Sequence, residues 1–369
     1  MGSADSAADR ADLHRQDAPD RPDDLRERLV RLPPGHPSSP CDTDAPRSRL
    51  RDLDAGGYGD GPAHPELSET ASAGPEGVGR ETRPDRQEAS PADRVAPLDD
   101  AEWAEHVAEV RDGLTDAAAD GRATNQQHTV DPDRQEWSRE RNRIQAALVA
   151  DLYEQAREVP CTGQAIIAGG LGGAGKSTVL STRAGTDLSQ YLYINPDSIK
   201  EEMARRGLIP HVDGLSPMEA SELVHEESSF IAKRLALRAT ADQKNVIWDI
   251  TMSSLDSTER RIDELRTAGY SVDGIFVDIP VETSVRRAEA RHRSGHEDYR
   301  AGIGLGGRYV PPEVIRAQAD DEWGSQNRKT FETVRHRFNQ WSRYDNSVDY
   351  QPAVLAEASQ PDENREERA

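Results

Sequence analysis

The stretch Gly163 to Thr178, GQAIIAGGLGGAGKST, constrains the fold more than any other part of the chain. A short apolar run is followed by Gly170, Gly175, Lys176 and Ser177 in the order G-x-x-x-x-G-K-S, and the residues after them favour a helix. This is the signature of a phosphate-binding loop in the strand–loop–helix setting that it requires. The alternative is a glycine-rich turn that merely closes a strand.

Glycines suit such a loop because a residue without a β-carbon can take positive φ and turn successive N–H groups toward one anion. The helix that follows adds the positive end of its dipole. We expect Lys176 to reach the β- and γ-phosphates and the Ser177 hydroxyl to ligate Mg²⁺. The residues expected to bind the nucleotide are those of the loop and the start of the helix: Gly170, Gly172, Gly173, Ala174, Gly175, Lys176, Ser177 and Thr178.

Composition separates the beginning of the chain from the rest. Residues 1–100 contain one aromatic side chain, Tyr58, and no lysine, whereas all four Phe lie beyond residue 229. Such a segment cannot bury enough apolar surface to offset its chain entropy. We therefore expect residues 1–96 to form a disordered acidic tail, and the polar residues 354–369 to form a flexible C-terminal tail.

Two helices are expected between the tail and the loop. Asp99 or Asp100 can cap the first, and the second begins at Pro132 and runs toward Val159. Each carries apolar side chains at helical spacing on one face. We expect residues 97–160 to form a helical extension that packs on the domain after it.

Residues 161–353 alternate between strand and helix patterns. The expected strands after the loop are Tyr191–Asn195, Asn245–Ile250, Val272–Ile279 and Ser347–Tyr350. The expected helices are Asp197–Arg206, Pro217–Thr240, Ser257–Ala268, Val281–Arg293, Pro312–Asp321 and Asn327–Arg343. Strands separated by helices of about ten or more residues require a parallel sheet covered on both faces, so the fold class is a three-layer α/β fold.

The formal net charge is −22, from 46 basic and 68 acidic residues. This balance argues against sequence-independent binding to nucleic acid or to an anionic membrane. No apolar run approaches the roughly 20 residues that span a bilayer, and the N-terminus has no apolar signal segment. We expect no nucleic-acid partner, no membrane partner and a cytoplasmic protein.

Three acidic residues stand at the ends of expected strands, where ligands sit in parallel sheets. Asp249 is the best candidate for Mg²⁺, because Thr251 and Ser253 follow it with hydroxyl groups. Asp197 opens a helix, where it can either cap that helix or take a proton from a substrate hydroxyl. Asp278 is either a structural residue or a lesser candidate for the site.

Downstream lies a basic cluster: Arg286, Arg287, Arg291, Arg293, Arg300 and Arg308. An arginine on a phosphoryl group in transfer can be worth about 10³ to 10⁵ in rate. Arg287 and Arg291 are four residues apart and share a helix face, and Arg308 sits in the flexible, glycine-rich segment GIGLGGRYVPP. A solvated basic helix face is the preferred interpretation of Arg286, Arg293 and Arg300.

The ordered set of motifs over Val159–Pro352 resembles the zeta toxins. The motifs are GGLGGAGKST, NPDSIK, WDITMSS, IPVETSVRRAEAR, GRYVP and YDNS. Zeta toxins are P-loop kinases, similar in fold to nucleoside-monophosphate kinases, that use ATP to phosphorylate UDP-N-acetylglucosamine on the 3′-hydroxyl of its sugar. By this resemblance Lys176 grips ATP and Ser177 supplies the Mg²⁺ hydroxyl.

The same resemblance assigns the remaining site residues. Asp197 matches the aspartate that activates the sugar hydroxyl, and Arg291 and Arg308 match the two phosphate-clamping arginines. Asp249 stands where founding members of the family carry Glu, so metal or substrate contact is implied. The catalytic candidates are therefore Lys176, Asp197, Arg291 and Arg308, and the metal candidates are Ser177 and Asp249.

The resemblance also implies ATP and Mg²⁺ as cofactors, a substrate pocket lined partly by residues 207–227, and a separate antitoxin protein as partner. The residues alone leave other functions open. The acceptor can be another sugar, a nucleoside or a polynucleotide end, because a carboxylate base and two arginines serve any hydroxyl. A function of another class is an ATP- or GTP-driven switch whose acidic tail recruits a partner.

Overall fold

The computed structural model describes residues 96–131 and 136–359. The tail expected over residues 1–96 therefore lies outside the described residues, apart from its last residue, and so do residues 360–369 of the expected C-terminal tail. The elements below all belong to one compact unit.

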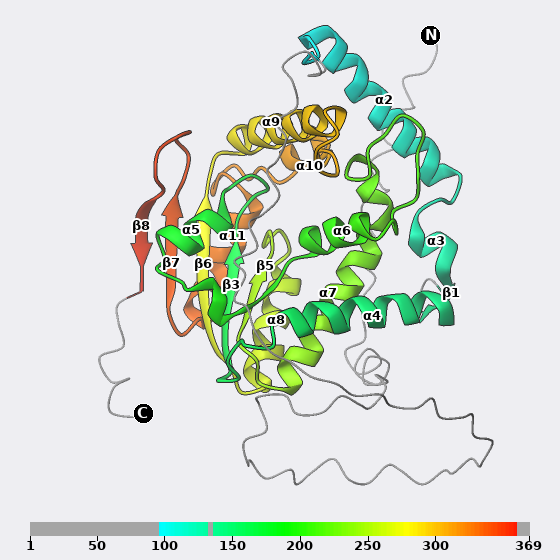
Figure 1. Cartoon of the computed structure of the whole chain (residues 1–369). Helices are drawn as coiled ribbons and strands as arrows, with labels where there is room; N and C mark the ends of the chain where they lie inside the picture. The colour runs from blue at the N-terminus through cyan, green and yellow to red at the C-terminus, as the bar shows by residue number, and fades with distance from the viewer. Residues whose placement is uncertain (1–95, 132–135, 360–369) are drawn as a thin grey trace, which may run out of the picture. The chain divides into compact units, whose positions relative to one another are not determined.

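A six-stranded sheet forms the centre of this unit, in the order β4-β5-β3-β6-β7-β8 (Figure 1). The strands are β3 (Gln164–Gly169), β4 (Leu192–Ile194), β5 (Val246–Asp249), β6 (Ser271–Asp278), β7 (Trp341–Asp345) and β8 (Val354–Ala358). The first five are parallel, and only β8 runs antiparallel, to β7. The inner strands are nearly continuous apolar runs because both faces of the sheet are covered.

Helices cover the two faces of the sheet, so the predicted three-layer α/β fold is confirmed. The helices after the loop are α5 (Lys176–Thr182), α6 (Pro196–Arg205), α7 (His225–Ala241), α8 (Leu255–Thr267), α9 (Val281–Arg300), α10 (Pro312–Arg316) and α11 (Gln326–Val334). Successive side chains of a strand point to opposite faces. Ile167 accordingly joins the core formed with α7 and α8, and Ile166 joins the core formed with α5.

The residues before the loop pack on this sheet domain. They form α2 (Asp100–Ala119), α3 (Thr124–His128), β1 (Thr129–Asp131), β2 (Glu136–Trp137) and α4 (Arg139–Gln155). Asp99 caps α2 in a capping box with Glu102, as one of the two predicted caps. The buried Val110 of α2 packs in a cluster with Leu223 and Tyr309 of the following domain.

A buried ion pair joins α4 to α7. Arg141 donates from Nε to Glu227 Oε1 at 2.6 Å and from its terminal nitrogen to Oε2 at 2.8 Å. Gln145, one turn further along α4, donates to the same carboxylate at 2.9 Å. Burial of a charged pair is tolerated better when hydrogen bonds satisfy its groups, and here Gln145 and the Leu208 carbonyl add to the bonds between the two side chains.

Two helix boundaries were predicted wrongly. The second helix of the extension begins at Arg139 rather than Pro132, because Ser138 caps it and a short antiparallel ribbon of β1 and β2 precedes it. The helix expected over Pro217–Thr240 is also divided. Its first part is the 3-10 helix η4 (Glu219–Val224), and only then does α7 begin.

The C-terminal part also differs from the prediction. The helix expected over Asn327–Arg343 ends at Val334, and Trp341–Asp345 forms β7 instead of a helical turn. Ser347–Tyr350 is not a strand, and Tyr350 has φ of 60°, which an extended strand does not allow. The strand β8 stands in the segment expected to be a tail, because backbone pairing with β7 holds it in the sheet although all five of its residues are exposed.

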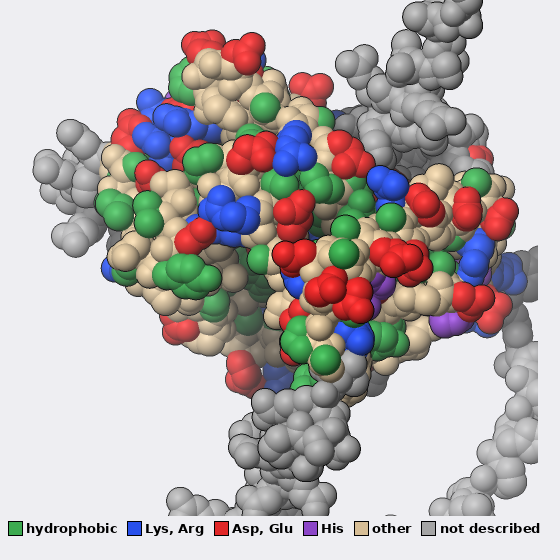
Figure 2. Space-filling model, turned by 90° about the horizontal axis from the view of Figure 1, so that it is seen from above, with side chains coloured by type: hydrophobic (Ala, Val, Ile, Leu, Met, Phe, Trp, Pro, Cys, Tyr) green, Lys and Arg blue, Asp and Glu red, His purple; other side chains and the backbone are tan. Residues whose placement is uncertain are grey.

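The surface carries charges of both signs. On the face drawn in Figure 2, acidic and basic side chains are interspersed rather than gathered into a basic patch. Within residues 96–131 and 136–359, no helix is both long and apolar enough to cross a bilayer.

Candidate functional site

The glycine-rich loop connects β3 to α5, and its glycines are required by the backbone. Gly170 has φ of 138° and Gly175 has φ of 81°, values that residues with a β-carbon rarely adopt. A β-carbon on Gly170 would also collide with the Val277 carbonyl oxygen, and one on Gly175 would lie 2.8 Å from Asn346 Nδ2. The loop backbone therefore follows one defined path, which passes too close to neighbouring atoms for residues with a β-carbon at Gly170 or Gly175.

Side chains behind the loop hold its carbonyl groups. Asn346 donates to the Ala174 carbonyl at 2.8 Å, and Ser284 donates to the Gly172 carbonyl at 2.6 Å. Arg287 donates to the Gly173 carbonyl at 3.3 Å. Fixing a carbonyl fixes its peptide unit, and therefore the direction of the neighbouring N–H group. Sequence reasoning had not assigned this supporting role to Asn346, Ser284 or Arg287.

The Lys176 side chain folds back over the loop and contacts the Asp249 carboxylate. Its Nζ donates to the Gly170 carbonyl at 3.0 Å and lies 3.4 Å from Asp249 Oδ1. The sheet register explains this contact between Lys176 and Asp249. Ala168, near the end of β3, pairs with Asp249 at the end of β5, and the loop follows β3. Both side chains are largely buried, with 12% and 8% exposed.

Asp249 is oriented by two donors from the neighbouring strand end. Its Oδ2 accepts hydrogen bonds from Asn195 Nδ2 at 3.0 Å and from the Tyr193 hydroxyl. Burial, together with the negative charge of Asp249, raises the pKa of Tyr193, so its hydroxyl stays a donor. These two bonds use Oδ2 and leave Oδ1 turned toward Lys176.

The residues predicted to hold Mg²⁺ suit that ion. A carboxylate oxygen and a hydroxyl are the hard ligands that Mg²⁺ takes, usually with several waters. Asp249 Oδ1 has lone pairs beyond its contact with Lys176. Ser177 and Thr178 are exposed in the first turn of α5, where their hydroxyls are accessible from solvent.

Asp197 is not the cap of α6, since the cap is Asn195. The Asn195 side chain accepts from the Asp197 backbone N–H at 2.7 Å, and Pro196 takes the first helical position. The carboxylate of Asp197 is consequently left for other partners. It forms an ion pair with Arg308.

Positive charges surround Asp197. Burial alone would raise its pKa, but the charges of Arg308, Lys200 and Lys176 outweigh burial and hold the pKa below the usual value of an aspartate. Lys200 lies three residues further along α6, and its side chain is 3% exposed. Its Nζ lies 3.3 Å from His225 Nδ1, within the region expected to line the substrate pocket.

Arg291 belongs to the same group of charges. Its side chain is exposed on α9. Partial desolvation by neighbouring protein groups and the like charge of Arg308 lower the pKa of Arg291, while the charges of Asp197 and Glu201 act in the opposite direction. The structure therefore connects Lys176, Asp249, Asp197 and Arg308 through direct contacts, and Arg291 lies near enough to Arg308 and Asp197 for their charges to act on it.

The other acidic and basic candidates have different partners. Arg286 pairs with Asp349 at 2.6 Å and Arg293 pairs with Asp100 at 2.7 Å, both on the surface, in agreement with the preferred interpretation. Asp278 lies 3.2 Å from a nitrogen of Arg328, in a structural ion pair.

A hollow of roughly 310 Å³ adjoins the loop. It is lined by α5 and by the segment after β7: Thr178, Val179, Thr182, Arg183, Asn346, Gln351, Pro352 and Ala353. This size is at the lower end of small-molecule sites. The hollow is the natural candidate for the base of a nucleotide whose phosphates lie on the loop.

The strand, the loop and the parallel sheet together define a P-loop nucleotide-binding fold. Residues 150–348, more than half of the chain, match the sequence profile of a family described as Zeta toxin. The chain belongs to the zeta toxin family, whose members are P-loop kinases.

Two solved structures illustrate the likeness. One is described as part of the PezAT chromosomal toxin-antitoxin system of the human pathogen Streptococcus pneumoniae, with 17% identity and a TM-score of 0.41, covering 57% of this chain and 79% of that one. The other is AvrRxo1-ORF1:-ORF2 with ATP, with 16% identity and a TM-score of 0.47, covering 62% and 72%. Both scores are too low to carry a functional conclusion. No curated protein sequence gives a significant match.

Proposed function

We propose that this chain is an ATP-dependent kinase that transfers the γ-phosphate to a hydroxyl group of a small molecule. The observation that carries the proposal is the continuous path from Lys176 through Asp249 and Asn195 to Asp197 and its partner Arg308. A phosphate-gripping lysine, a metal-binding carboxylate, a base and an arginine are the parts that phosphoryl transfer needs.

The nucleotide is held by the loop, with Lys176 on the β- and γ-phosphates and the base in the adjoining hollow. Mg²⁺ on Ser177 and Asp249 neutralises phosphate charge when bound. In the absence of substrates, Lys176 lies against Asp249 and the Gly170 carbonyl. We infer that phosphate replaces these contacts of the lysine.

Asp197 acts as the base. It accepts the proton of the acceptor hydroxyl while the hydroxyl oxygen bonds to the γ-phosphorus and the bond from that phosphorus to the bridging oxygen breaks, releasing ADP. During transfer, Arg308 leaves Asp197 and, together with Arg291, contacts the transferring phosphoryl group. Before transfer, the ion pair keeps Arg308 and Asp197 next to the reaction centre. An arginine there neutralises charge on the equatorial oxygens.

UDP-N-acetylglucosamine is the first acceptor to test, on the 3′-hydroxyl of its sugar, because the family supports it. A nucleotide switch is less well supported, since it has no use for a base beside the phosphate loop. The mixed charges in Figure 2 also favour a small acceptor over a polynucleotide.

The test is incubation of the full chain with ATP, Mg²⁺ and a panel of UDP-sugars, sugars and nucleosides, followed by mass analysis. The proposal predicts that one acceptor gains one phosphate while ATP becomes ADP. Slow ATP hydrolysis with every acceptor unchanged would contradict it and favour the switch.

The family also supports a toxic activity restrained by a separate antitoxin protein. Expression of the wild-type chain alone should then arrest growth of a bacterial host, whereas Lys176→Ala should not. Equal growth of the two strains at equal protein levels would argue against toxicity.

A further inference from the structure

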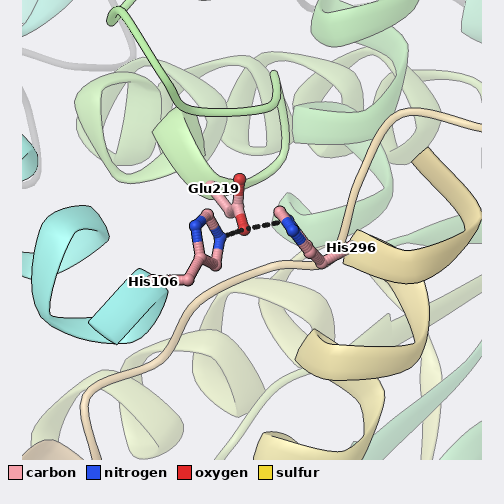
Figure 3. A group of neighbouring side chains, drawn as sticks. All are labelled: His106, Glu219 and His296. Carbon is pink, nitrogen blue, oxygen red and sulfur yellow. Dashed lines mark hydrogen bonds and ion pairs between the residues drawn. The ribbon is translucent and has the colours of Figure 1, made fainter. Parts of the chain in front are cut away.

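Three histidines and one glutamate from three separate elements form a buried cluster outside the phosphate site. His106 comes from α2, Glu219 from η4, and His292 and His296 from α9. Figure 3 shows His106 and His296 pointing at the Glu219 carboxylate from opposite sides. His292 and His296 are four residues apart and therefore share one face of their helix.

The nitrogen atoms of the three histidines converge on one atom, Glu219 Oε1. It lies 2.7 Å from His106 Nε2, 3.0 Å from His292 Nε2 and 3.0 Å from His296 Nδ1. The ligand atoms of His106, Glu219 and His296 all lie within 4.8 Å of one another, whereas His292 is outside this group. Ligands about 2.0–2.2 Å from a tetrahedral zinc ion are about 3.3–3.6 Å apart, so an ion bound by these three groups requires Oε1 to move away from the nitrogens by roughly half an ångström.

The surroundings fix the direction of these ligands. Ser216 donates to the other carboxylate oxygen of Glu219 from its backbone nitrogen at 2.8 Å and from its hydroxyl at 2.7 Å. This leaves Oε1 for the histidines. The indole of Trp103 packs over His292 with ring centroids 4.8 Å apart and covers the cluster. Supporting contacts of this kind hold the ligands of metal sites in place.

The charge of the cluster also favours a cation. The Glu219 side chain is fully buried. Among the side chains described in contact with its carboxylate, none is a lysine or an arginine. Hydrogen bonds from the three histidines and Ser216 stabilise the charged carboxylate, and a dication would add the full positive charge that no lysine or arginine supplies there.

We propose that His106, Glu219 and His296 bind one divalent transition-metal ion of the zinc class, which ties α2 to η4 and α9. Two imidazole nitrogens and one carboxylate oxygen suit Zn²⁺ or Co²⁺, whereas Mg²⁺ and Ca²⁺ prefer sites made of oxygen ligands. His292 Nε2, which lies 3.0 Å from Glu219 Oε1, is the nearest further ligand. With it, four protein ligands close the coordination shell, so the ion is structural rather than catalytic.

The site also lies behind the arginines of the phosphate site. His292 follows Arg291 directly, and a β-carbon on Gly307, next to Arg308, would collide with the His292 carbonyl oxygen. The segment that carries Arg308 is therefore packed directly on the metal-binding turn of α9. The ion would hold both arginine-bearing segments in register with the extension.

The test uses the full chain without an affinity tag, stripped with a chelator and dialysed. Zn²⁺ is added and bound metal is measured by elemental analysis, and thermal unfolding is followed with and without the ion. We expect one tightly bound zinc per chain and a rise in Tm of about 5 °C or more. Co²⁺ in place of Zn²⁺ should give the visible absorption of a tetrahedral cobalt site with nitrogen and oxygen ligands.

The variants are His106→Gln together with His296→Gln, and the matched control His336→Gln, which changes an exposed histidine elsewhere. The double variant should lose the bound zinc and the shift in Tm, while the control keeps both. If the double variant does not fold, the zinc stoichiometry and the cobalt spectrum of the wild-type chain are sufficient to test the proposal. A stripped wild-type chain that takes up no stoichiometric zinc, shows no shift in Tm and gives only the spectrum of hydrated Co²⁺ would overturn the proposal and leave a hydrogen-bonded cluster.

Discussion

Replacing Arg141 by Met should destabilise the folded chain strongly. The Arg141 guanidinium donates hydrogen bonds to both oxygens of the Glu227 carboxylate. The Arg141 side chain is only 8% exposed and the Glu227 side chain only 1%. Arg141→Met leaves that carboxylate buried with the single donor Gln145 and also removes a hydrogen bond to the Leu208 carbonyl. Breaking one partner of a buried pair costs about 3–5 kcal/mol.

The loss can be measured by urea unfolding and by thermal unfolding. For a domain of this size, about 3–5 kcal/mol corresponds to a fall in Tm of about 6–20 °C. The control Arg143→Met changes an exposed arginine of the same helix and should stay within about 0.5 kcal/mol of wild type.

A double replacement separates the pair from its surroundings. Arg141→Met with Glu227→Leu removes both charges of the pair, so it should recover most of the stability lost in the single variant. The reasoning is refuted if Arg141→Met is as stable as the control. It is also refuted if the destabilisation of the double variant equals the sum of the destabilisations of Arg141→Met and Glu227→Leu measured alone.

Three further predictions concern the phosphate site. Lys176→Ala should lower phosphoryl transfer by about 10²-fold or more, measured as ADP release at saturating acceptor. Gly170→Ala should abolish ATP binding in a dialysis assay, because its β-carbon would collide with the Val277 carbonyl oxygen. Since the folded pKa of Asp197 is depressed, its base form is lost only as the pH falls through a value below the ordinary 3.8, so kcat/KM should show no acid limb from this group between pH 5 and 8. An acid limb near pH 6 would count against Asp197 as the base.

The sequence predicts the sheet and the phosphate loop because both depend on local patterns. Buried parallel strands are continuous apolar runs, and the loop needs glycines at particular positions. Residues whose roles depend on distant partners were missed. Asn346 donates a hydrogen bond to the Ala174 carbonyl of the loop, 172 residues earlier in the chain. Nothing in the sequence around Asn346 predicts that contact.

The same limit applies to the capping of α6 and to the C-terminal strands. Asp197 and Asn195 are both good caps by type, and only the structure shows that Asn195 takes the position and frees the carboxylate. The strand β8 is held by backbone pairing with β7 and not by burial of its side chains, so its sequence does not show that it is a strand. The spacing of His292 and His296 was visible in the sequence, but their convergence with His106 and Glu219 depends on tertiary packing.

The most direct test of the proposed function is phosphoryl transfer by Asp197→Asn, measured beside its affinity for ATP. The exposed Asp116→Asn on α2, outside the predicted substrate region, serves as control. The account predicts that Asp197→Asn loses transfer by about 10²- to 10⁴-fold while its Kd for ATP stays within a factor of about two. Full transfer by Asp197→Asn would contradict the assignment of this carboxylate as the base.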